Sequence, residues 1–194
     1  MKAQSQKSVD IGKQGLAKQD IGQQTVWRFD PSHTSVEFSV KSLLFFTVRG
    51  RLATLEGTLV LDEADIQRSS VNATLNADGI DTGKRWRDVQ LRSSAVLDVR
   101  NWPNIEFQSS KVGPGKDRDM VAVTGTLTIK GKSSEVVLDV MEIDRSRSPQ
   151  GEQVIYYLAT TELNRFDFGI SYLRGVIGRT VKVTINAQVI LDTF

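Results

Sequence analysis

The side chains with the most obvious capacity for acid–base chemistry are one histidine and two aspartates. His33 is the only histidine among the 194 residues, and Asp81 and Asp88 stand on either side of Arg87 in the sequence. Either His33 or the two carboxylates could move protons in an enzyme that acts on a small apolar substrate. Such an enzyme also needs a nucleophile and an orienting group, and the sequence does not reveal where these would lie.

A structural role is the favoured interpretation of each of these residues. His33 follows the turn at Pro31, and we expect its ring to bond to backbone at one end of the fold. Asp81 or Thr82 is suited to cap the start of a helix, and Asp88 to pair with a neighbouring charge. We therefore predict that the protein is not an enzyme and has no catalytic residue.

The composition excludes several other kinds of site. The chain has no cysteine, which rules out disulfides, thiolate zinc sites and a cysteine nucleophile. One histidine with scattered carboxylates is too little for a metal site. The sequence also has no phosphate-binding glycine loop, nucleophile elbow or HExxH motif. We expect neither a metal nor a cofactor.

The charges and apolar runs limit the partners and the location. The net charge is only +2, and basic residues alternate with acidic ones, as at residues 116–119, so we expect no nucleic-acid partner. No apolar run is long enough for a membrane span. Residues 1–24 are polar and are predicted to be a flexible tail, with one domain at residues 25–194. The first residues contain no apolar signal stretch, which predicts a cytoplasmic protein, or a periplasmic one if a native leader is missing.

Strands are the elements that must position all these residues. Apolar and polar residues alternate with the period of two that is typical of half-buried strands. The longest such series contains Val181, Val183, Ile185, Ala187, Val189 and Leu191. About eight short strands separated by turn signals indicate an all-β barrel or sandwich. A closed barrel of eight strands can hold one small apolar ligand.

One segment interrupts the strands. Residues 83–98 favour a short helical insertion, in which Trp86, Val89 and Val96 fall on one face. We expect that face to turn toward the barrel. Trp102 precedes Pro103 and closes the segment, because the residue before a proline is pushed out of helical geometry.

Five phrases, in order, resemble the YceI-like family. They are FDPSHTSVEFSV at residues 29–40, GIDTG with RD and LRS at 79–93, WPNIEFQS at 102–109, GTLTIKG at 125–131 and LNRFDFG at 163–169. The resemblance extends over about residues 27–189, nearly the whole domain. It implies a lipocalin-like, eight-stranded antiparallel barrel that holds a long isoprenoid- or quinone-type lipid in its lumen. We also expect a possible homodimer and possible transient contact with a membrane.

The chain departs from the family at several positions. The family often has histidine where this chain has Ser42 and Gln90, and an aromatic residue is common where this chain has Ala95-Val96. If the family residues touch a ligand head group or a metal, this chain lacks that contact. Arg165 and Asp167, in the last phrase, are expected to form an ion pair that fixes a loop at the barrel end.

The expected ligand-binding residues are apolar side chains of the lumen. They are Phe38, Val40, Phe45, Trp86, Val89, Phe107, Phe166 and Phe168. Each buried methylene contributes about 0.8 kcal/mol, so ten chain carbons could contribute roughly 8 kcal/mol before the costs of binding. Two alternatives stay open: an enzyme that uses His33 or the Asp81/Asp88 pair, and an interaction module whose lumen is filled by side chains. The volume of the interior cavity distinguishes the lipid-binding barrel from the filled one.

Overall fold

The computed structural model describes residues 24–43, 45–52 and 55–192. The tail predicted at residues 1–24 lies outside these ranges apart from Gln24. The strands are β1 (Thr25–Phe29), β2 (Ser35–Ser42), β3 (Phe46–Leu52), β4 (Leu55–Leu61), β5 (Ser70–Asn76), β6 (Ile80–Asp81), β7 (Asn104–Pro114), β8 (Met120–Ile129), β9 (Lys132–Arg147), β10 (Gln153–Asn164) and β11 (Ile177–Leu191). The helices are α1 (Arg85–Arg92) and two short 3-10 turns, η1 (Ile66–Arg68) and η2 (Ala77–Gly79). No helix in the described ranges has the length and apolar character needed to cross a bilayer.

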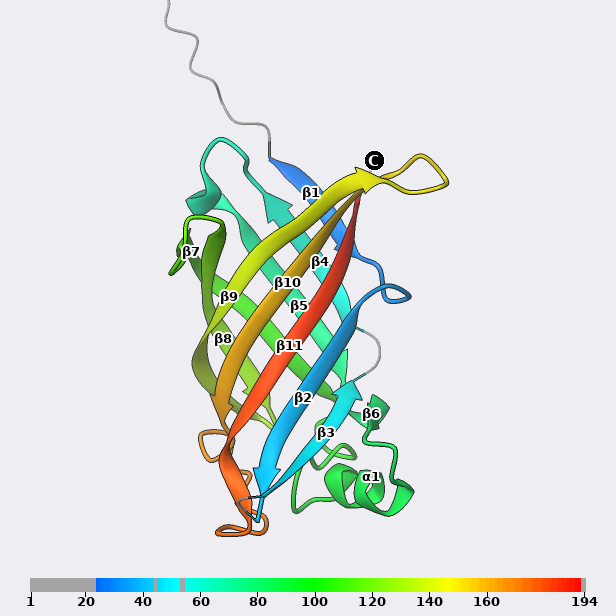
Figure 1. The fold of residues 1–194 in the computed structure, drawn as a ribbon, viewed down its shortest axis with the longest axis vertical. Helices are drawn as coiled ribbons and strands as arrows, with labels where there is room; N and C mark the ends of the chain where they lie inside the picture. Colours follow the sequence, from blue (N-terminus) through cyan, green and yellow to red (C-terminus); the bar gives the residue numbers. More distant parts are fainter. Residues whose placement is uncertain (1–23, 44, 53–54, 193–194) are drawn as a thin grey trace, which may run out of the picture.

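The sheet closes on itself as an antiparallel barrel (Figure 1). Eight strands form the ring in the order β1–β4–β5–β7–β8–β9–β10–β11, and β11 pairs with β1 to complete it. Closure leaves the ring without a free edge that could pair with another chain. The prediction of an eight-stranded antiparallel barrel with a short helical insertion is confirmed.

Strands β1 and β2 share one edge of β11. Trp27 pairs with Leu191 near the end of β11, and Val40 pairs with Val181 near its start. The turn between the two strands is held to β11 at Gln188, whose carbonyl accepts from the Asp30 amide at 2.9 Å. Strand β2 then pairs with β3, which pairs with the short β6. The barrel wall is therefore continued toward α1 by these three strands.

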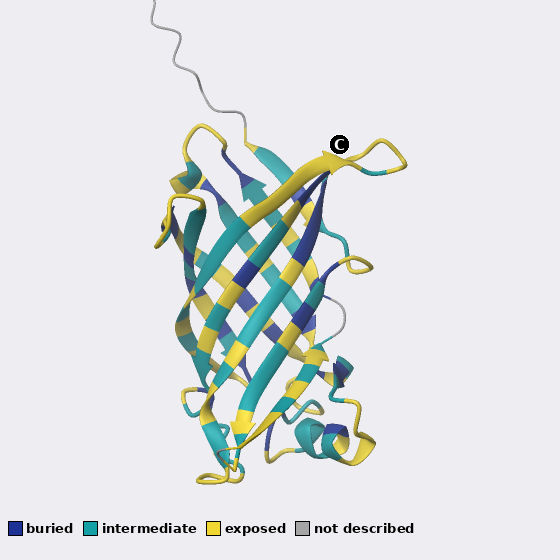
Figure 2. Cartoon of the chain, in the orientation of Figure 1, coloured by how far each residue is buried: buried dark blue, intermediate teal, exposed yellow. Residues whose placement is uncertain are grey.

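Burial alternates along the wall, as the period of two requires (Figure 2). The inward side chains form one long apolar cluster that includes Val36, Leu75 and Phe107. A second cluster packs around Trp27 and Val189, which are 2% and 0% exposed. The inward set therefore forms both the core and the wall of any interior space.

The helical insertion differs from its prediction in length and in orientation. The helix ends at Arg92, so Val96 lies in the turns beyond it, where it is buried. Trp86 is 72% exposed and Val89 is 60% exposed, whereas Asp88 is buried. The expectation that the Trp86, Val89 and Val96 face turns toward the barrel is wrong for Val89, and the helical pattern does not continue to Val96.

A polar contact fixes this orientation. The Asp88 carboxylate accepts from the Thr82 amide at 2.9 Å and from the Thr82 hydroxyl at 2.5 Å. The expected helix cap at Asp81 or Thr82 is also wrong, because Lys84 occupies the N-cap position and makes no side-chain cap bond. Asp81 instead accepts from the Gly83 amide and pairs with Arg51, whose guanidinium lies 2.9 Å away.

The wall depends on close backbone contact at Gly57 in β4. Its φ is 147°, and a Cβ there would lie 2.0 Å from the Asn72 carbonyl oxygen of β5. We predict that Gly57→Ala lowers the free energy of unfolding by roughly 1–3 kcal/mol, because strained backbone and a backbone clash both oppose the side chain. Urea unfolding monitored by circular dichroism measures the change. The control is Gly113→Ala in β7, where an added Cβ has no neighbour within 4 Å, and equal losses in the two variants would contradict the prediction.

Candidate functional site

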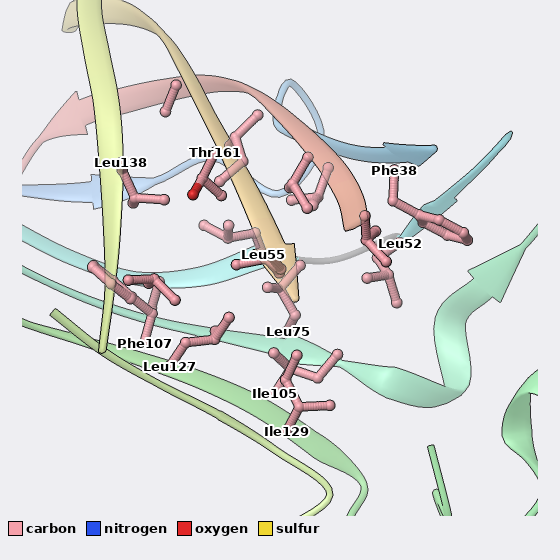
Figure 3. Close-up of a pocket in the computed structure, with 18 of the residues that line it drawn as sticks. Phe38, Leu52, Leu55, Leu75, Ile105, Phe107, Leu127, Ile129, Leu138 and Thr161 are labelled. Carbon is pink, nitrogen blue, oxygen red and sulfur yellow. The ribbon is translucent and has the colours of Figure 1, made fainter. Parts of the chain in front are cut away.

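An apolar cavity of about 1140 Å³ runs through the barrel. This exceeds the roughly 300–1,000 Å³ of most small-molecule pockets. Inward side chains of all eight ring strands and of β2 and β3 line it. Figure 3 labels Phe38, Leu52, Leu55, Leu75, Ile105, Phe107, Leu127, Ile129, Leu138 and Thr161 on its wall. The space is bounded almost entirely by aliphatic and aromatic carbon, so it suits an apolar ligand.

Two phenylalanine rings lie against glycines of neighbouring strands. A Cβ on Gly125 would come within 2.5 Å of the Phe107 ring, and a Cβ on Gly50 would come within 2.5 Å of the Phe38 ring. Each ring thus occupies space that a side chain would otherwise fill. This close packing against the wall helps to leave the middle of the lumen open.

One end of the cavity opens between apolar side chains. The β2–β3 turn, α1 and the β10–β11 connection lie at that end (Figure 1). The five most exposed large apolar side chains of the described ranges belong to the first two of these segments, and Leu173 of the third is 46% exposed. We call this set the apolar rim: Leu43, Phe45, Phe46, Trp86, Val89 and Leu173. Phe46, Trp86 and Leu173 also line the cavity, so the rim is continuous with the lumen.

Arg165 holds the β10–β11 connection in place. Its buried guanidinium donates to the carbonyls of Gly178, Ile170, Tyr172 and Ile177 at 2.7–2.9 Å. Burial lowers the pKa of this guanidinium, but an arginine in a protein keeps its charge. The side chain therefore fixes one side of the cavity mouth.

The expected ion pair between Arg165 and Asp167 is wrong. Arg165 donates to backbone carbonyls, and Asp167 accepts from the side-chain amide of Asn164 at 2.7 Å. The expectation that Arg165 fixes a loop at the barrel end nevertheless agrees with the contacts. The charged guanidinium of Arg165 binds backbone carbonyl oxygens rather than the carboxylate of Asp167.

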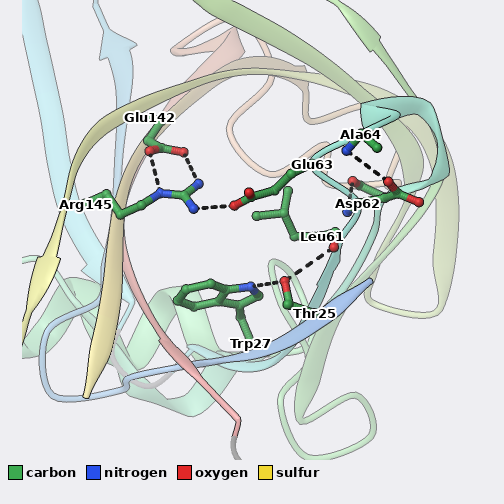
Figure 4. Close-up of polar contacts among 9 residues, drawn as sticks. Thr25, Trp27, Leu61, Asp62, Glu63, Ala64, Glu142 and Arg145 are labelled. Atoms are coloured by element: carbon green, nitrogen blue, oxygen red, sulfur yellow. Dashed lines mark hydrogen bonds and ion pairs between the residues drawn. The ribbon is translucent and has the colours of Figure 1, made fainter. Parts of the chain in front are cut away.

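The opposite end carries a cluster of paired charges (Figure 4). Arg145 donates to both carboxylate oxygens of Glu142, at 3.0 and 3.1 Å, and also to Glu63. Burial, followed by the nearby charge of Glu142, raises the pKa of the Tyr157 phenol above its usual value. All four side chains line the cavity. This end therefore presents polar groups that largely satisfy one another.

Five of the eight predicted lumen residues lie on the cavity wall. They are Phe38, Val40, Trp86, Phe107 and Phe168. The other three lie outside it, which corrects their predicted position. Phe45 is 89% exposed on the β2–β3 turn, and Val89 points away because Asp88 fixes the opposite face of the helix. Whether any of the eight binds a ligand stays a prediction.

Phe166 is the third correction. Strand β10 ends at Asn164, and a turn follows in which the Gly169 amide donates to the Phe166 carbonyl. The period of two no longer holds there, so Phe166 and Phe168 do not share a side. The Phe166 ring instead lies under the guanidinium groups of Arg165, Arg174 and Arg179, 4.7–5.8 Å from its centre.

The residues considered for catalysis are engaged in structural contacts. The His33 side chain is 65% exposed, and its Nδ1 lies 2.7 Å from Asp30 Oδ2, so the ring bonds a carboxylate rather than backbone as expected. Burial raises the pKa of Asp30, but the hydrogen bonds from His33 and the Ser32 amide outweigh it and hold that pKa below its usual value. Asp81 and Asp88 bond to backbone amides and to Arg51 or Thr82, as described above. These contacts provide no acid–base pair facing the lumen.

The sequence predicted the positions of the polar cavity residues less well than those of the apolar ones. Ser42 and Gln90, where the family often has histidine, both line the cavity, as does Arg87. Alternation in β10 would have placed Tyr157 on the inward face. No local signal brings Glu63 to Arg145, because these residues are far apart in the sequence. Among the described residues, no three His, Cys, Asp or Glu side chains come together as a metal site.

A closed antiparallel barrel around an apolar cavity defines a class of small binding barrels, and comparison with known proteins identifies the family. The family model for the YceI-like domain matches residues 27–189. The chain therefore belongs to the YceI-like family, as its sequence phrases predicted.

Relatives and solved structures agree with this assignment. The chain is 31% identical over 164 residues to a UPF0312 protein of Pectobacterium atrosepticum, which covers 84% of each chain. Its fold is similar to that of BcnA of Burkholderia cenocepacia, with a TM-score of 0.74 and 19% identity over 82% of this chain and 98% of that one. It is also similar to a polyisoprenoid binding domain of Saccharophagus degradans, with a TM-score of 0.63 and 14% identity over 87% and 99%. These two structural likenesses show a shared fold.

The role of Arg165 can be tested by removing its donors. We predict that Arg165→Met lowers the free energy of unfolding by roughly 2–4 kcal/mol, because hydrogen bonds from a charged group contribute about 1.5–3 kcal/mol each and are not additive. Urea unfolding measures this loss, and limited proteolysis of the β10–β11 connection should be faster. Arg179→Met is the control, because Arg179 is exposed and lies over the same Phe166 ring. Equal effects of the two substitutions would show that Arg165 does not hold the connection.

Proposed function

We propose that the lumen binds the apolar chain of a long isoprenoid- or quinone-type amphiphile, which the protein sequesters or carries. The observation that carries this proposal is the continuous apolar cavity of about 1140 Å³, which opens at the apolar rim. A flexible hydrocarbon chain is the kind of ligand that fills a long space lined by aliphatic and aromatic side chains. The open mouth allows a polar head group to stay in water while the chain enters.

The energetics favour such a ligand without a sharp polar motif. Each methylene transferred from water to the lumen contributes about 0.8 kcal/mol, so a long chain can overcome the cost of its own ordering. A few polar groups then suffice to orient the head group. Ser42, Gln90 and Arg87 line the cavity on segments of the mouth and are the groups we assign to this task. The polar groups of the opposite end are already paired with one another.

The comparisons support this proposal. The chain belongs to the YceI-like family, and one solved domain with the same fold is described as polyisoprenoid binding. We extend that kind of ligand to this chain because its own cavity is apolar and continuous. Polyprenols and quinones both carry a long isoprenoid chain, so both serve as ligands in the binding experiment.

The two alternatives have less support. An enzyme that uses His33 or the Asp81/Asp88 pair would need these groups to face a substrate, and they are bound to Asp30, Thr82, Arg51 and backbone instead. An interaction module with a filled lumen conflicts with the cavity volume. We therefore propose binding without catalysis.

Filling the lumen should abolish binding. Ala159 of β10 is 7% exposed and lines the cavity, so Ala159→Phe places a ring inside it. We predict that this variant takes up at least tenfold less polyprenol or quinone than the parent, because the ring occupies the volume of several chain carbons. Lipid dispersed in detergent is incubated with the protein, unbound lipid is removed by gel filtration, and bound lipid is extracted and measured by mass spectrometry.

The matched control is Ala122→Phe in β8. Ala122 lies between the lumen residues Val121 and Val123 and is absent from the cavity wall, so this substitution should leave uptake unchanged. Thr161→Phe, also on the wall, replaces Ala159→Phe if the latter fails to fold by circular dichroism. A parent protein that takes up neither lipid, or equal uptake by the lumen and control variants, would contradict the proposal.

A further inference from the structure

The apolar rim is an unusual surface for a water-exposed end of a barrel. Phe45 is 89% exposed, Trp86 72% and Phe46 67%. These side chains come from segments far apart in the sequence that meet at the mouth. The Leu43 amide donates to the Val176 carbonyl at 2.9 Å, which ties the β2–β3 turn to the β10–β11 connection. The β2–β3 turn and the β10–β11 connection therefore form one surface, and Trp86 of α1 lines the same cavity as Phe46 and Leu173.

Basic residues surround this surface. Residues 41–49, 84–92 and 165–179, which carry the rim, contain nine lysines and arginines and two acidic residues. Asp88 is buried against Thr82, and Asp167 accepts from the side-chain amide of Asn164. Of the nine basic residues, only Arg92 takes part in an ion pair within the described part of the chain, with Asp78. The mouth thus combines exposed apolar groups with uncompensated positive charge.

We propose that the apolar rim docks the barrel, mouth first, on the surface of an anionic lipid bilayer. This inference rests on the proposed function, since a lipid chain must leave a membrane to reach the lumen. Tryptophan, phenylalanine and leucine beside lysine and arginine are the residues that insert shallowly at a charged membrane interface. Docking places the open mouth against the acyl chains, so the chain can enter the lumen without crossing water.

The charge of the rim favours a bilayer over a second copy of this chain. A symmetric dimer formed through the rim would place the same patch of each copy face to face. Its basic residues, such as Lys84, Arg85 and Arg174, would then approach their equivalents without acidic partners. An anionic bilayer instead supplies the missing negative charge, and each basic residue near its surface adds to binding.

Vesicle binding tests this inference. The full chain is centrifuged with vesicles of phosphatidylcholine alone or with 30% phosphatidylglycerol, a composition chosen to carry about the negative charge of an anionic leaflet. We expect binding to the anionic vesicles that weakens as salt rises, and little binding to the neutral ones. Brominated lipid should quench the fluorescence of Trp86. A Trp86→Phe variant should lose this quenched component of the emission.

Matched variants separate the apolar and charged parts. Phe45→Ser should weaken vesicle binding about tenfold, because it removes an exposed aromatic side chain from the interface. Arg85→Glu should weaken binding to anionic vesicles by about tenfold or more. The controls are Ile143→Ser, which is 55% exposed on β9, and Arg118→Glu on the β7–β8 turn. Both should leave vesicle binding unchanged.

The result can be told apart from a failure of lumen binding. Phe45 and Arg85 are not part of the cavity wall, so both variants should load lipid normally from detergent. Ala159→Phe should bind vesicles but not load. Vesicle binding that is equal in Phe45→Ser and Ile143→Ser would overturn the docking inference. So would a dimer that Phe45→Ser converts to monomer in a protein that ignores vesicles, because the rim would then be an interface between copies.

Discussion

Strand β11 pairs with β10 along one edge and with β2 and β1 along the other. This double pairing closes the barrel, and the other features follow from it. Once the ring is closed, alternate side chains of every strand must point inward, and the register between strands determines which ones meet. A barrel of eight strands encloses a space that its side chains can fill or that can hold one small ligand. Gly50 and Gly125 let two aromatic rings lie against that wall, so the space stays open.

Both ends of the barrel carry arginines, but these arginines have different partners at the two ends. At one end, Arg145 is paired with Glu142 and Glu63 beside the half-buried Tyr157. At the other end, Arg165 is used up in binding backbone carbonyls, while nearby basic residues stay unpaired around the apolar rim. Pairing lowers the cost of placing charge in contact with the lumen, whereas unpaired charge and exposed apolar side chains favour contact with a charged lipid surface. The two ends of the cavity therefore differ, and the end at the apolar rim is the one suited to contact with lipid.

The sequence predicted the regular part of this structure well. Alternation in the strands identified the barrel, and Phe38, Val40 and Phe107 lie on the cavity wall because the period of two holds along β2 and along β7 as far as its bulge between Ser109 and Lys111. It failed where the strands end. Phe166 sits in a turn, and Val89 is directed outward by the contact between Asp88 and Thr82. The charge cluster was not predictable, because it joins residues that only the closed ring brings together.

The most direct measurement of the central claim is to locate a bound isoprenoid chain by methyl NMR. Leu138 and Val137 are neighbours on β9, but Leu138 lines the cavity and Val137 is 46% exposed on the outer wall. Protein with labelled leucine and valine methyl groups is mixed with an unlabelled polyprenol, and intermolecular nuclear Overhauser effects are recorded. Binding in the lumen predicts strong effects at Leu138 and at Leu127, which lines the cavity from the neighbouring strand β8, and none at Val137. Effects confined to Val137 and the apolar rim would contradict it.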